Sequence, residues 1–187
     1  MSRLLCLLAL TFGAMQGAVA QEHAPEAAQQ DTAASDATAE ATHQVSRLIS
    51  EKFGVARAKA EQISAAVMSA ASKYSLPPAL LLAIISVESR FKEKARGANG
   101  ATGLMQVVPT AHKQLVRNID LTEATANIEA GSAILHGYVQ SARGDVGAAL
   151  KSYGGSKAYA EKVSLRARTL APEVGLDAGT NAGTNGD

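Results

Sequence analysis

Apolar residues recur along the chain with a helical period, three or four positions apart, between residues 43 and 170. The positions that establish the period are Val45, Leu48, Ile49, Phe53, Ile63, Val67, Ala70, Tyr74, Ile128, Leu135, Tyr138, Val139 and Ala142. No run alternates apolar and polar residues as a half-buried strand would. The pattern predicts a compact all-α domain of roughly six helices.

The sequence SLPPALLLAIISVESRF contains the most apolar of these helices. Ser75 is predicted as its N-cap, with Pro77 and Pro78 in the first turn, where a missing N–H costs nothing. The helix from about 78 to 90 is apolar on every side, which indicates a place at the centre of the domain.

Later helix boundaries also follow from capping residues. Asp120 or Thr122 can open the next long helix, and Gly144-Asp145 divides it from VGAALKSY. Ser156 is predicted to cap a last helix, KAYAEKVSLRARTL.

The two ends of the chain differ in composition from the domain. Arg3, a short apolar stretch and Ala18-Val19-Ala20 predict a cleaved signal peptide over residues 1–20, too short for a bilayer span of about 20 residues. The mature chain would begin at Gln21, without a membrane span, in the periplasm or outside the cell. Residues 21–42 hold five acids and no bulky apolar residue, so we predict a disordered acidic linker, and 171–187 a disordered tail.

Charge is distributed unevenly, although the net charge of the whole chain is only +1. Residues 43–170 hold 17 basic and nine acidic residues, which suits a polyanionic surface, ordinary solubility charge being the alternative. Nucleic acid is a poorer partner, since the chain is predicted to be exported and only 4% of it is aromatic. The sole cysteine, Cys6, lies in the signal and the four histidines lack zinc spacing, so no metal or cofactor is expected.

Glu88 is the candidate for chemistry, because it stands at the end of the apolar helix on the same face as Leu81, Ile84 and Ile85. Desolvation and the negative end of the helix dipole should both raise its pKa. A carboxylic acid held protonated in this way can serve as a general acid. The alternative is an ion pair with Lys92 at i+4, which would lower the pKa instead.

The loop after this helix is rich in glycine. Gly97, Gly100 and Gly103 allow backbone groups to approach a ligand closely, and Ser89 and Gln106 add a hydroxyl and an amide. These groups suit a hydroxyl-rich, amide-bearing ligand such as an N-acetylated sugar.

Four motifs in order, ESRF, GANGATGLMQVVPTA, NIEAG and AALKSYGG, resemble the soluble lytic transglycosylase family over roughly residues 76–165. The resemblance implies a lysozyme-like fold and cleavage of the β-1,4 bond between N-acetylmuramic acid and N-acetylglucosamine in peptidoglycan, leaving 1,6-anhydromuramic acid ends. Glu88 would be the sole catalytic acid and base. The matching substrate-contacting positions are Ser89, Gly103, Leu104, Met105, Gln106, Asn127 and Tyr153.

Four of these positions also suit purely structural roles. Leu104 and Met105 fit as core residues, Asn127 as an N-cap or packing residue, and Tyr153 as a core tyrosine. The family has Asn after the tyrosine, whereas this chain has Gly154, which removes an amide from the cleft wall.

The resemblance leaves three functions open. The leading one is an exported lytic transglycosylase whose small size resembles members that open the wall for a secretion or conjugation apparatus. A goose-type hydrolytic lysozyme would share the fold and the lone acid. A non-catalytic glycan-binding or assembly scaffold is the third, although such a protein has no need of a buried acid.

Overall fold

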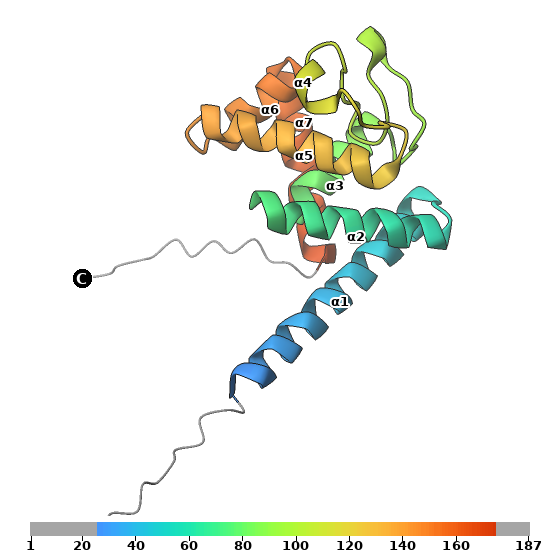
Figure 1. Ribbon diagram of the computed structural model, residues 1–187, viewed down its shortest axis with the longest axis vertical. Coiled ribbons are helices and arrows are strands. Elements are labelled where there is room, and N and C mark those ends of the chain that lie inside the picture. The colour runs from blue at the N-terminus through green and yellow to red at the C-terminus, as the bar shows by residue number, and fades with distance from the viewer. Residues whose placement is uncertain (1–25, 175–187) are drawn as a thin grey trace, which may run out of the picture.

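The protein is described by a computed structural model over residues 26–174, with side chains described from residue 35 (Figure 1). Its helices are α1 (Glu26–Phe53), α2 (Arg57–Tyr74), α3 (Pro78–Glu88), α4 (Lys113–Val116), α5 (Ala124–Ser141), α6 (Val146–Gly154) and α7 (Lys157–Leu170), with 3-10 turns η1 (Ala98–Gly100) and η2 (Ala171–Val174). Pairing between extended segments in this range is limited to isolated antiparallel bridges of Thr102 with Arg96 and Val107. The all-α fold is therefore confirmed, with seven α-helices in the described range instead of six.

No helix within residues 26–174 is long and apolar enough to cross a bilayer. The predicted signal peptide, residues 1–20, lies outside the described residues.

Helix α3 lies at the centre of the domain, as its sequence predicts. All residues from Ala79 to Ser86 are buried, and the helix packs against α7, with α2 and α5 on either side of it in Figure 1. Ser75 is not its N-cap: it closes α2 in a left-handed conformation (φ 51), and Pro77 takes the N-cap position. A residue that precedes proline is held out of the helical region, so the helix can begin only at Pro78.

The other predicted caps are correct except at α5. Glu123, not Asp120 or Thr122, caps α5, because its carboxylate accepts two backbone N–H groups of the first turn. Asp120 instead accepts hydrogen bonds from the N–H and hydroxyl of Thr122, which forms a turn before the helix. Ser156 caps α7 as predicted, and Asp145, within the predicted Gly144-Asp145 boundary, caps α6.

The predicted disordered linker is wrong from residue 26 onward, because α1 is one continuous helix that extends away from the domain (Figure 1). Its C-terminal half is anchored to α2 through buried residues such as Val45 and Ile49. Residues 35–40 are exposed, so this segment buries little, and the high helix propensity of its alanines extends a helix that packing has already nucleated. The remainder of the predicted linker, 21–25, is not described.

The predicted disordered tail is likewise wrong at its beginning. Residues 171–174 form η2, which packs against α1 and α7 with Val174 fully buried. Lys52 of α1 and Glu173 form an ion pair at 2.5 Å across this contact. Residues 175–187 lie outside the described range.

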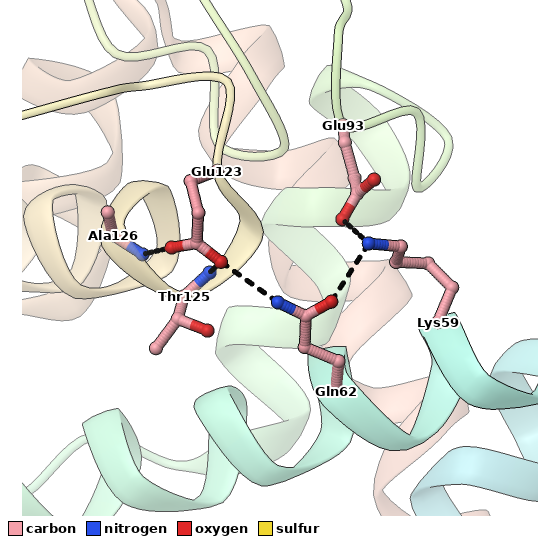
Figure 2. A network of polar contacts seen from close by, with 6 residues as sticks. All are labelled: Lys59, Gln62, Glu93, Glu123, Thr125 and Ala126. Atoms are coloured by element: carbon pink, nitrogen blue, oxygen red, sulfur yellow. Dashed lines mark hydrogen bonds and ion pairs between the residues drawn. The ribbon is translucent and has the colours of Figure 1, made fainter.

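A polar network ties α2 to the segments on both sides of the loop that follows α3 (Figure 2). Lys59 forms an ion pair with Glu93 at 2.8 Å and donates a hydrogen bond to Gln62. Gln62 donates in turn to Glu123, the N-cap of α5, at 2.9 Å. The network therefore links the segment that follows α3, through α2, to the start of α5.

Candidate active site

The backbone turns sharply directly after Glu88, the last residue of α3. Arg90 and Phe91 both adopt left-handed conformations, with φ of 53 and 63. Such conformations are disfavoured for residues with a side chain, at a cost on the order of 1 kcal/mol or more each, and persist only where packing imposes them. Here the buried ring of Phe91 packs against Phe53 of α1, with ring centroids 4.4 Å apart.

The environment of Glu88 favours its protonated form. Burial of the half-buried carboxyl raises its pKa above the ordinary 4.5, and the Tyr159 hydroxyl and the charge of Lys162 only partly oppose this. The alternative pairing is not observed, because Glu88 and Lys92 form no ion pair within the described residues. The predicted direction of the pKa shift is therefore confirmed.

Two tyrosines, Tyr153 of α6 and Tyr159 of α7, lie beside Glu88, with their rings stacked at 6.5 Å. The Tyr153 hydroxyl donates to the Met105 carbonyl at 2.8 Å, which joins α6 to the loop. Burial, and then the negative charge of Glu88, raise the pKa of both tyrosines, so both remain protonated donors. Tyr153 thus lies within electrostatic reach of the acid, while its hydroxyl bonds the loop.

Tyr159 was not predicted from the sequence. Its buried hydroxyl has no hydrogen bond of ordinary geometry within the described residues, yet it lies close enough to Glu88 to stabilise the carboxylate. The sequence places Tyr159 only relative to the cap of α7, because its backbone N–H donates to the Ser156 hydroxyl. It therefore stands in the first turn, at the end of α7 nearest α6.

Gly154 provides the space for the Tyr159 ring. A Cβ atom at position 154 would lie 2.1 Å from the Cδ1 atom of that ring, a distance no real contact reaches. The departure from the family pattern therefore has a steric consequence here, because this ring occupies the space that a side chain at residue 154 would need.

The side chain of Asn127 holds the loop in place from the interior of the protein and is not exposed to solvent. It is fully buried; its amide donates to the carbonyls of Thr102 (2.8 Å) and Leu121 (2.9 Å) and its oxygen accepts from the N–H of Met105 (2.8 Å). Gly103, at φ +83, allows this, since a Cβ there would lie 2.1 Å from the Asn127 amide nitrogen. Of the two structural roles expected for Asn127, the N-cap is wrong and the packing role fits, because the side chain is fully buried. A buried side chain with these partners is not placed to contact a substrate.

Ser89 and Gln106 also use their donors internally. The Gln106 amide donates to the carbonyls of Ala95 (3.2 Å) and Gly103 (2.9 Å). The buried hydroxyl of Ser89 donates to the Ile85 carbonyl of its own helix at 3.1 Å. Two of the three glycines in the loop are therefore approached by side chains of the protein itself: Gly97 by Gln106 and Gly103 by Asn127. Gly100 has no atom within 4 Å of the position that a Cβ would take.

Leu104 and Met105 are core residues, as their apolar side chains suggest, and neither exposes any surface. They can contribute only backbone groups to a cleft. Of the predicted site residues, the structure thus brings together Glu88, Tyr153 and the backbone of Met105, and adds Tyr159.

Residues 65–172, more than half of the chain, match the model of the Transglycosylase SLT domain. The chain belongs to the SLT family. The matched region begins within α2 and ends in η2, so α1 lies outside it.

A solved structure shows the same fold: an inactive mutant of the lytic transglycosylase Slt from Pseudomonas aeruginosa, in which a glutamate is replaced by glutamine. The TM-score is 0.55 at 22% sequence identity, and the match covers 60% of this chain and 24% of that one. The SLT protein described here therefore spans about a quarter of the length of that relative.

Proposed function

We propose that this SLT protein is an exported lytic transglycosylase that cleaves the β-1,4 bond between N-acetylmuramic acid and N-acetylglucosamine in peptidoglycan. The observation that carries the proposal is Glu88, a desolvated carboxyl with a raised pKa at the end of a buried helix. Two further findings support it: membership of the family, and likeness in fold to a lytic transglycosylase whose inactive mutant carries a Glu-to-Gln change.

Glu88 would act twice in this reaction. Protonated, it would donate its proton to the glycosidic oxygen as the bond to the leaving sugar breaks. As a carboxylate, it would then accept the proton of the C6 hydroxyl of the muramic acid ring while that oxygen attacks C1. The product is a 1,6-anhydromuramic acid end, and no water is consumed.

The internal nucleophile is favoured because the other carboxylates considered from the sequence have structural roles. A hydrolase needs a second carboxylate near the acid, either to activate water or as a nucleophile. Glu93 pairs with Lys59, Glu129 accepts from Tyr74 at 2.6 Å, and Glu123 and Asp145 cap helices. An intramolecular hydroxyl held against C1 has an effective concentration that bulk water cannot match.

The place of action is part of the proposal. The predicted signal peptide would direct the protein to the periplasm or beyond, where it would open the wall for a secretion or conjugation apparatus. In this proposal the acidic segment that begins α1, which stands away from the domain (Figure 1), tethers such an apparatus without obstructing Glu88.

The test is digestion of purified sacculi by wild-type protein and by Glu88→Gln. The amide is isosteric, so the variant should fold, and its rate of muropeptide release should fall by a factor of about 10² or more. Glu161→Gln is the matched control, because Glu161 is an exposed acid of α7 and should retain wild-type activity. A Glu88→Gln variant that digests sacculi at the wild-type rate would remove Glu88 from the mechanism, and wild-type binding without turnover would favour a scaffold.

A further inference from the structure

Unpaired cations gather at the C-terminal end of α3, around a pocket of about 430 Å³ between α1 and α7. The cations that line it are Lys52, Arg90, Lys162 and Arg166, and no acid lines it. Lys52 pairs with Glu173, whereas the other three form no ion pair with any side chain described between residues 35 and 174. Like charges placed together repel one another, so this arrangement is favoured only beside negative charge.

The protein itself supplies negative charge at this end of α3. The last carbonyl groups of a helix carry the negative end of its dipole, and Glu88 is the last residue of the helix. Val87 precedes Glu88 and Arg90 follows it two positions later, and both line the pocket. The cations therefore border the helix end that carries the candidate acid.

Helix α7 brings two of the cations to this place on the same face as the tyrosine beside the acid. Tyr159, Lys162 and Arg166 are spaced i, i+3 and i+7, which puts them on one face of the helix, and α7 packs against α3. The charge of Lys162 lowers the pKa of Glu88, against the larger effect of burial. Arg168, by contrast, lies on the opposite face of α7 and lines a groove shared with α6.

The other titratable groups around Glu88 add no charge of their own. Lys52 of α1 is neutralised by its acidic partner. Burial raises the pKa of the phenols of Tyr153 on α6 and Tyr159 on α7, so both remain neutral donors. The charges left to act on Glu88 are those of the three unpaired cations: Arg90 of the turn, and Lys162 and Arg166 of α7.

The proposed reaction requires Glu88 in two forms. It must be protonated to cleave the bond and ionised to accept the proton of the C6 hydroxyl. Burial favours only the first form, because a desolvated carboxylate is costly without a positive charge nearby. A group that serves as both acid and base is most effective when its pKa lies near the working pH, so that both forms are reached in each turnover.

We propose that Lys162 and Arg166 are positioning residues whose charges stabilise the carboxylate form of Glu88, so that the same group can serve as the base in the second half of the reaction. The inference rests on the proposed function, because that function needs Glu88 in both forms. The cations exchange no proton. Glu88 gives its proton to the glycosidic oxygen and regains one from the C6 hydroxyl, and the positive charges act only on the state between.

The test removes the two charges of α7 and measures the pKa of Glu88 directly. Lys162→Met/Arg166→Met replaces both cations by unbranched apolar side chains, and Lys162→Arg keeps the charge. Arg168→Met is the matched control, because it removes an exposed arginine from the opposite face of the same helix. A pH titration of the Glu88 carboxyl carbon by NMR gives its pKa in each protein, and circular dichroism checks that each protein is folded.

In the double variant the pKa of Glu88 should be higher than in wild type, whereas Lys162→Arg and the control should match wild type. The cations are exposed, and salt screens exposed charges over about 10 Å at 0.1 M, so the difference should shrink as salt is added. On sacculi, the alkaline limb of the pH–rate profile should move to higher pH in the double variant, with KM unchanged.

Three outcomes would decide against one proposal or the other. An unchanged pKa of Glu88 in the double variant, while the wild-type protein digests sacculi, would overturn the inference and leave the lytic activity in place. A raised KM with an unchanged pH–rate profile would overturn it as well, since the cations would then act on the substrate instead of on Glu88. A raised pKa in a protein that cleaves no peptidoglycan would keep the electrostatic link and reject the proposed function.

Discussion

The end of α3 and the loop around Asn127 are neighbouring regions that differ in how their polar groups are satisfied. At Asn127 each buried donor and acceptor of the side chain is matched to a backbone group of the loop. At Glu88 a carboxyl is desolvated, the Tyr159 hydroxyl lacks an ordinary hydrogen bond within the described residues, and two successive residues are strained. The loop around Asn127 stabilises the fold. The end of α3 keeps polar groups without full partners and a strained backbone, features that stability alone does not explain.

This difference separates structural residues from candidates for chemistry better than residue type does. Asn127, Gln106 and Glu88 are all polar residues in motifs of the SLT family. Of these three, only Glu88 has an ionised form that burial disfavours. Burial therefore favours the protonated carboxyl, which is what a general acid needs.

Replacement of Asn127 should have the largest effect on stability. Asn127→Ala leaves the N–H of Met105 and two carbonyls buried without partners, so the free energy of unfolding should fall by about 3 kcal/mol or more. Urea denaturation followed by circular dichroism measures the change, with the exposed Asn118→Ala as control. A loss below about 0.5 kcal/mol would contradict this, because the loop would then not depend on the Asn127 side chain.

Gly154→Ala should have the next largest effect. The new methyl group would overlap the Tyr159 ring, which should cost about 1–3 kcal/mol and displace the ring from Glu88, lowering activity as well. Gly137→Ala, on α5 with nothing within 4 Å of the added carbon, is the control and should be neutral or stabilising. If Gly154→Ala behaves like the control, the Tyr159 ring is free to move.

Glu88→Gln should change stability in the opposite sense to Asn127→Ala, and by less. The pKa of Glu88 is raised in the folded state, so the native protein binds more protons than the unfolded chain, and stability falls as pH rises from the ordinary 4.5 through the raised value. The variant should therefore melt above wild type at pH 7, with the difference disappearing below about pH 4. Melting curves across pH with Glu161→Gln as control measure it; a variant less stable than wild type at pH 7 would show that the carboxylate is stabilised in its site.

Tyr159→Phe should produce the smallest shift. The hydroxyl lowers the pKa of Glu88, so its loss should raise that pKa and move the alkaline limb of the pH–rate profile to higher pH. Tyr138→Phe, which removes a hydroxyl from a ring that contacts Tyr153 instead, is the control. An unchanged limb in Tyr159→Phe would mean that this hydroxyl does not act on Glu88.

The sequence was sufficient for the helical class, the central α3 and the environment of Glu88, because all three depend on local periodicity and on one helix end. The beginning of α1 was misjudged because lack of bulky apolar residues excludes a core but not a helix that another segment nucleates. Tyr159 escaped detection because its relation to Glu88 arises from the packing of α7 on α3, which no spacing in the sequence encodes.

The glycine-rich loop shows a second limit of sequence reasoning. Glycines indicate that some group approaches the backbone closely, but not whether that group belongs to a ligand or to the protein. At Gly103 the approaching group is the amide of Asn127. The same limit applies to Asn127. Its place in a motif suggests a substrate contact, whereas its amide forms hydrogen bonds with backbone groups of the loop.

The central claim is that Glu88 acts with the C6 hydroxyl of the substrate and without a second carboxylate. Digestion of sacculi in water enriched in heavy oxygen, followed by mass spectrometry of the released muropeptides, tests it most directly. The expected products carry 1,6-anhydromuramic acid ends, lighter by one water than hydrolysis products and without heavy oxygen. Reducing ends that carry the solvent oxygen would contradict it and identify a hydrolase of the lysozyme kind.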